Sequence, residues 1–138
     1  LDLSDEIRSV LKQRVGDVVL TQTRGALDGF ALCLTGPGSE GGEKLCYIKF
    51  GAARPGPGAD KRSSASAAKR FDQLLASCES FAASRNLTIE AGVNLAREDA
   101  FRRMKAHGYR VTTQGVSMQR PHADGFNRAD AYVIDDWR

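Results

Sequence analysis

Three cysteines and two histidines are the residues of this sequence whose side chains most readily bind metals or act as nucleophiles. Cys33, Cys46 and Cys78 are odd in number and widely spaced, which argues against a disulfide framework and against a zinc site. Each has apolar neighbours in the sequence, so we expect three small core residues in a reducing compartment. His107 and His122 have no cysteine or acidic residue at ligand spacing. The sequence therefore predicts no metal site.

The totals fit one globular domain spanning residues 1–138. Hydrophobic residues make up 41% of the chain and charged residues 27%, values that are ordinary for a soluble protein. The net charge of +3 is too small to indicate nucleic-acid binding. No apolar run is long enough to span a bilayer. The chain starts at Leu1 without a leader, so we expect a processed chain or a piece of a longer one, located in the cytoplasm.

Hydrophobic periodicity predicts nine elements in the order α-β-β-β-α-β-α-β-β. They are a helix ending near 15, strands at 18–23, 30–34 and 45–50, a helix over 71–86, a strand at 87–93, a helix at 97–107, and strands at 110–119 and 132–137. The strand, helix, strand unit over 45–93 implies a right-handed parallel crossover. Hairpins at both ends of the chain imply antiparallel pairs. The fold class is therefore α/β, with a central mixed sheet flanked by helices.

Two segments carry a resemblance to a known family. In VVLTQTRGALDGFALCL, residues 18–34, a variable hairpin precedes a Gly-Phe pair. In VNLAREDAFRRMKAHGY, residues 93–109, the matching residues are Val93, Ala100, Gly108 and Tyr109. Their order and spacing resemble the GNAT superfamily of acyl-CoA N-acyltransferases, without its first strand and first helix. The resemblance implies transfer of an acetyl group from acetyl-CoA to an amine of a small molecule or a protein.

The resemblance places the CoA diphosphate at the start of the long helix. Backbone N–H groups of a helix start and of a glycine-rich loop bind anions. Here Pro57 stands where the family has its first glycine, and proline has no N–H to donate. Either the loop binds in a shifted frame through Gly58, Ala59 and Lys61, or the helix starts later, among residues 63–68. The other alternative is that this segment is a solvated linker.

Three more positions take their expected roles from the resemblance. Backbone N–H groups from Phe50 to Ala52 would polarise the thioester carbonyl. Arg97 stands where the family has an asparagine, and it would either meet a phosphate or carbonyl of the cofactor or form a surface charge. Met104 stands where the family often has a catalytic tyrosine. A thioether cannot transfer a proton, so we expect Met104 in the core.

Acyl transfer to an amine requires a base, and Glu90 is the candidate. It lies on the strand predicted at 87–93, and its role depends on whether its face looks into the cleft or into solvent. Asp135 and Asp136 are weaker candidates for the same role. Asp124 and His122 are candidates to line an acceptor pocket.

Two other function classes compete with the enzyme. A non-catalytic GNAT-fold domain, binding a ligand or regulating a longer protein, is favoured by Pro57, Arg97 and Met104. A nucleic-acid-binding domain is disfavoured, because the basic segments have no interleaved aromatic residues. An exposed strand at the edge of the sheet also invites pairing with another chain, so a homodimer is a further expectation.

Overall fold

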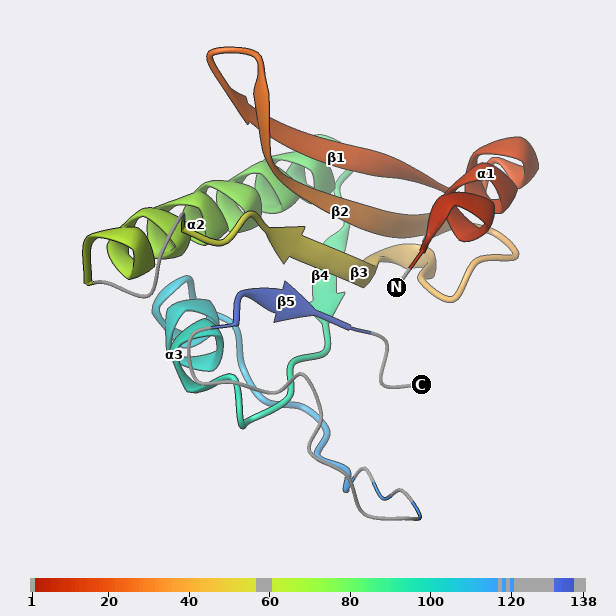
Figure 1. The fold of residues 1–138 in the computed structure, drawn as a ribbon. Helices are drawn as coiled ribbons and strands as arrows, with labels where there is room; N and C mark the ends of the chain where they lie inside the picture. Colours follow the sequence, from red (N-terminus) through yellow and green to blue (C-terminus); the bar gives the residue numbers. More distant parts are fainter. Residues whose placement is uncertain (1, 57–60, 117, 119, 121–130, 136–138) are drawn as a thin grey trace.

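The computed structural model describes residues 2–56, 61–116, 118, 120 and 131–135, and of residues 61–64 the backbone alone. Eight elements follow one another along this part of the chain (Figure 1). They are α1 (Ser4–Gln13), β1 (Gly16–Thr23), β2 (Ala26–Gly36), β3 (Gly42–Ala53), α2 (Lys61–Ala83), β4 (Thr88–Ala91), α3 (Glu98–Ala106) and β5 (Val133–Ile134).

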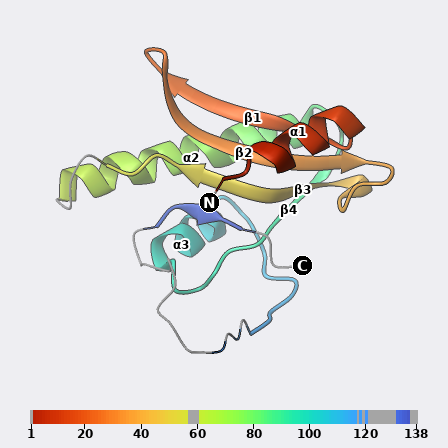
Figure 2. The same cartoon turned by 45° about the vertical axis from the view of Figure 1, so that its right-hand side comes forward.

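The strands form one mixed sheet, as predicted. β1, β2 and β3 pair in antiparallel order, and β4 then pairs with β3 in parallel through Leu45–Ile48 and Thr88–Ala91. β5 pairs with β3 as well, antiparallel, at Gly51 and Ala52. In both views β5 lies between β3 and α3 (Figures 1 and 2). The parallel pairing of β3 and β4, which α2 connects, confirms the parallel connection predicted over residues 45–93.

Helices cover both faces of this sheet. On one face, Cys33 and Ile48 are buried against Phe71 and Leu74 of α2, and α3 joins the same cluster. On the other face, Leu32 and Tyr47 are buried with Val10 of α1. Because neighbouring residues of a strand point to opposite faces, each of β2 and β3 contributes to both clusters.

Helix α2 starts at Lys61, so two parts of the sequence prediction are wrong. The helix does not wait until residues 63–68, and residues 61–70 are not a linker. Composition misled the prediction, because alternating Ser, Ala and basic residues read as solvated chain. Alanine is the best helix former, and Ala67 and Ala68 are buried against the sheet. β3 likewise continues to Ala53, beyond the predicted end at Phe50.

The strand predicted at 110–119 is wrong for the described residues 110–116, 118 and 120, none of which lies in a strand. The apolar residues that suggested it have no core to face: Val111 is 48% exposed, Val116 84% and Met118 88%. Without a buried face and a ladder partner, an extended segment gains little from strand pairing. The last strand is also short, because only Val133 and Ile134 of the predicted 132–137 pair, with 136 and 137 outside the described residues.

The predicted ends of the two later helices are confirmed. Asn86, after α2, has a φ of 56°, and Gly108, after α3, has a φ of 96°. Both are left-handed conformations, which glycine and asparagine adopt at helix ends with least strain. In the described part of the chain, no helix combines the length and apolar character needed to cross a membrane.

The three cysteines come together in the core between the sheet and α2, the helix that carries Cys78. Cys33, Cys46 and Cys78 are fully buried and unoxidised, and the Cys33 thiol hydrogen-bonds to the other two. That hydrogen bond and burial raise the pKa of Cys46. For Cys33, the bond to Cys46 lowers the pKa, but the bond to Cys78 and burial outweigh it. All three cysteines are therefore core residues, as the sequence suggested, and the raised pKa values of Cys33 and Cys46 keep those two thiols protonated.

Thiols that are fully buried should not react in the native protein. We expect an aromatic disulfide reagent to modify none of them at mildly alkaline pH before unfolding, and all three after addition of denaturant. Absorbance of the released thiolate measures the reaction. Modification of the native protein at the rate of a free cysteine peptide would contradict the packing of this cluster.

Candidate functional site

The site is built around the point at which β3 and β4 separate. Their pairing ends at Ile48 and Ala91, while β3 continues to Ala53. The chain after β4 runs instead to α3, and β5 takes over the edge of β3 that β4 leaves. The same edge of β3 is thus shared by two strands of opposite direction.

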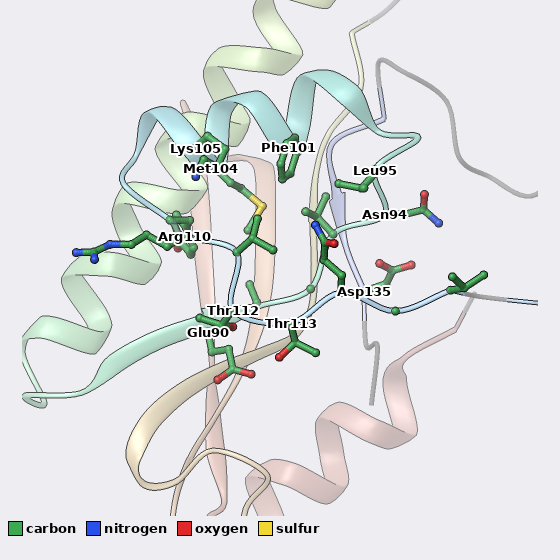
Figure 3. Close-up of a pocket in the computed structure, with 18 residues that line it drawn as sticks. Glu90, Asn94, Leu95, Phe101, Met104, Lys105, Arg110, Thr112, Thr113 and Asp135 are labelled. Carbon is green, nitrogen blue, oxygen red and sulfur yellow. The ribbon is translucent and has the colours of Figure 1, made fainter.

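A cavity of about 750 Å³ lies beside the end of β4. Its walls are residues 90–95, one side of α3 and the extended segment 109–116 (Figure 3). The side chains that give it chemical character are Glu90, Phe101, Met104, Lys105, Thr113 and Asp135. The volume lies within the range of pockets that bind small molecules.

Glu90 lies on β4 and lines this cavity. Its neighbours Ile89 and Ala91 pack against the core beneath α2, so Glu90 points to the face of the sheet that carries α1. Its partner in the ladder, Tyr47, is buried on that face with Val10. Figure 3 shows Glu90 beside Thr113, at the other end of the cavity from Lys105 and Phe101. The Glu90 carboxylate therefore lines the cavity from the face of the sheet that carries α1.

Phe50 and Ala52 lie inside the sheet. Ala52 pairs with Phe30 of β2 on one side and with Val133 of β5 on the other. The N–H of Ala53 donates to the carbonyl oxygen of Tyr132 at 3.0 Å, and the N–H of Arg54 donates to that of Asp28 at 2.7 Å. Because backbone N–H groups alternate along a strand, those of Phe50 and Ala52 point toward β2. The segment from Phe50 to Ala52, whose backbone amides we expect to polarise a thioester carbonyl, thus has β2 on one side and β5 on the other.

Arg97 is buried at the start of α3, so the alternative of a surface charge is wrong. Its guanidinium donates to both carboxylate oxygens of Asp135 at 2.8 Å and to the carbonyl oxygen of Val133 at 3.1 Å. A bidentate pair of this kind fixes the geometry of both partners. Arg97 therefore fastens β5 to α3, and through Asp135 it borders the cavity.

A second contact fastens the same segment. The Tyr132 hydroxyl donates to Asp99 of α3 at 2.5 Å, and Arg103 donates to Asp99 at 2.9 Å and to Asp72 of α2 at 2.7 Å. Burial raises the pKa of Asp99, but the hydrogen bonds from Tyr132 and Arg103 outweigh it and keep that pKa below its ordinary value. Residues 132–135 are thus held from two points of α3.

Met104 is buried at 3% exposure, which confirms its predicted place in the core. It also forms part of the cavity wall with Tyr109. The Tyr109 hydroxyl is buried and has no hydrogen-bond partner in the described residues. Burial raises the pKa of Tyr109, so its phenol stays protonated. Neither residue presents a group that takes up or gives up a proton readily at neutral pH.

The expected phosphate loop is described only at its two ends. Gly58 and Ala59 lie outside the described residues, as do His122, Asp124 and Asp136, and Lys61 is described as the first backbone position of α2. At the near end, Arg70 of α2 donates to the carbonyl oxygens of Arg54 and Pro55 at 3.2 and 3.3 Å. The chain entering this loop is therefore held against α2.

The sequence analysis did not identify Asp28, the residue that organises the start of this loop at Arg54 and Pro55. Asp28 is 2% exposed and accepts hydrogen bonds from Thr23 and Arg54, and its oxygen lies 3.0 Å from Arg70. The pKa of Asp28 is lowered most by the hydrogen bond from Thr23 and next by the hydrogen bond from Arg54. An aspartate between turn glycines is typical of a solvated turn, so the sequence carried no signal for its burial.

Neither a metal centre nor a known relative identifies the site. Within the described residues, no three His, Cys, Asp or Glu side chains are grouped to hold a metal ion. Comparison of the chain with family models, with characterised proteins and with solved structures finds no match. What stands is the mixed α/β fold with its parallel β3–β4 pair.

The buried ion pair of Arg97 yields a stability prediction. Replacement Arg97→Ala removes three hydrogen bonds to the β5 segment, so we expect unfolding in urea to require about 1–3 kcal/mol less free energy. Arg102→Ala is the control on the same helix, since Arg102 is 64% exposed with carboxylates at 3.6 and 3.9 Å, and should cost under about 0.5 kcal/mol. Equal losses in the two variants would contradict a fastening role for Arg97.

Proposed function

We propose that the protein is an acyl-CoA-dependent N-acyltransferase that transfers an acetyl group to a primary amine. The observation that carries the proposal is the separation of the parallel strands β3 and β4, with Glu90 next to the last ladder pair and on the cavity wall. The resemblance of residues 18–34 and 93–109 to the GNAT superfamily supports the proposal. The order of the elements, in which α2 follows β3 directly, supports it too.

In the proposed reaction, the ammonium of the acceptor first gives a proton to Glu90. The free amine then attacks the thioester carbonyl, so that a C–N bond forms and the C–S bond breaks. The attached nitrogen gives up its second proton, which passes through water to the leaving thiolate, because Met104 has none to give. A general base contributes about 10²- to 10⁴-fold to such a step.

The second candidate is a ligand-binding domain without catalysis. It is favoured by the pairing of β5 with Gly51 and Ala52, which places a strand beside the backbone that the reaction would use. The engagement of Arg97 by Asp135 and the thioether at Met104 favour it too. On this alternative, the 750 Å³ cavity binds a small molecule and releases it unchanged.

Binding of the donor is the first test. A ligand that binds only the folded protein stabilises it by about 2.7 kcal/mol at a hundred times its dissociation constant. We therefore expect acetyl-CoA at millimolar concentration to raise the melting temperature by several degrees, with acetate alone as the control. An unchanged melting temperature would remove the transferase and leave the second candidate.

The base is tested by replacement. Glu90→Gln keeps the shape of the side chain and removes its ability to accept a proton, so kcat should fall about 100-fold or more while acetyl-CoA affinity stays the same. Glu43→Gln is the matched control, because Glu43 is an exposed carboxylate on β3 that does not line the cavity. Release of free CoA thiol measures turnover. Full activity of Glu90→Gln would exclude this residue from the mechanism.

A further inference from the structure

Strand β1 ends the sheet on one side and leaves an edge open. In both views it is the outermost strand on the side away from α3 (Figures 1 and 2). Within the described residues, β1 pairs with β2 and with no other strand. An open edge of eight residues presents a row of backbone N–H and C=O groups to whatever lies beside it.

The groups at this edge belong to alternate residues. The N–H of Thr35 donates to the carbonyl oxygen of Val15 at 3.0 Å, so odd-numbered residues of β1 face β2 and even-numbered residues face outward. The N–H of Val18 agrees with this alternation, because it donates at 2.8 Å to the side chain of Asp17. The irregularity in the ladder adds Asp28 to β2, so β1 keeps its alternation to its end. The residues with outward backbone groups are therefore Gly16, Val18, Leu20 and Gln22.

Little in β1 protects this edge. Edge strands usually avoid pairing with other chains through lysine, proline or an extra residue of their own. β1 contains neither lysine nor proline, and its single charged residue, Asp17, lies near one end. Near the middle is Leu20, which is 54% exposed and pairs with the half-buried Phe30 of β2. An edge that combines open backbone groups with an exposed apolar side chain fits another strand as its partner.

The sequence of β1 fits a second copy of itself. Two identical strands related by a twofold axis perpendicular to the sheet run antiparallel, and the residue on the axis faces its own counterpart. With Leu20 on the axis, its outward N–H and C=O groups bond to those of the other Leu20, and the two exposed side chains meet. Val18 then faces Gln22, and Asp17 faces Thr23. The only charge of the strand thus meets a neutral residue, and no like charges are opposed.

We propose that the protein forms a homodimer through antiparallel pairing of β1 with β1 of a second copy, centred on Leu20. The two five-stranded sheets then join into one, and neither copy keeps an open β1 edge. The N–H of Val18 exchanges its bond to Asp17 for one to the carbonyl oxygen of Gln22 in the other copy. The cavity beside β4 lies at the opposite end of the strand order, so the dimer does not depend on the proposed acyl transfer.

Charge at the centre of the edge gives the first test. Leu20→Lys removes the apolar contact and opposes two like charges, so the dissociation constant from sedimentation equilibrium should rise at least about tenfold. Leu20→Glu should have the same effect. An equal mixture of the two variants should associate again, because each lysine then faces a glutamate. Leu27→Lys is the matched control, since Leu27 is 48% exposed on β2 and away from the edge, and should leave association unchanged.

Amide hydrogen exchange tests the strand pairing in the wild-type protein, without any substitution. The N–H of Leu20 faces outward, so its exchange should slow at least about tenfold as the protein concentration rises through the dissociation constant. Val19 is the internal control, because its N–H faces β2 and should exchange slowly at every concentration.

The contrary outcomes are distinct. A wild-type protein that stays monomeric at millimolar concentration would overturn the proposal, and so would a dimer that Leu20→Lys leaves intact. Failure of the mixed variants to associate would exclude the pairing of Leu20 with its own counterpart. Slow exchange of the Leu20 N–H in a monomer would show that another segment of the same chain occupies the edge, and it would also overturn the dimer.

Discussion

The structure depends on how one edge of β3 is divided. Over Leu45–Ile48 this edge is paired with β4, and over Gly51–Ala52 it is paired with β5. A strand edge left open would expose unpaired N–H and C=O groups, so the end of β4 obliges another segment to take its place. The arrangement of α3, of the cavity and of the last described strand all follows from that requirement. It also decides which backbone groups of β3 are accessible to a ligand.

A two-residue strand cannot hold this position by its ladder alone, and side chains supply the rest. Ile134 and Tyr132 are buried in the main core, Tyr132 packs against Phe71, and Arg97 binds Asp135 from α3. The charged contacts on α3 thus serve packing, although a helix rich in arginine suggests a binding surface when it is read as sequence. The segment 93–109 thus has a structural role through these contacts, and part of it lines the cavity.

Much of the fold could be predicted, because periodicity reports burial. The two core faces of β2 and β3, the long helix α2, the inward side of α3 and the parallel crossover all follow from apolar spacing. The segment 110–116 could not be predicted, because two valines among polar residues give a strand pattern whether or not a neighbouring strand is present to pair with it. The burial of Asp28 and of Arg97 could not be predicted from the sequence either, because it depends on partners 26 and 38 residues away along the chain.

The same consideration separates the two candidate functions. A catalytic site needs its polar groups to stay available to a substrate, whereas a folded core satisfies them internally. Here the arginine at the start of α3 and the backbone of β3 are satisfied internally, and Glu90 lines the 750 Å³ cavity. The observations that favour an acyltransferase are therefore the separation of β4 from β3 and the place of Glu90 on the cavity wall, and those that oppose it are the internal pairing of Arg97 and of the Gly51–Ala52 backbone. A donor that binds from the α1 face would need no displacement of β5, and that is the geometry in which both sets of observations hold together.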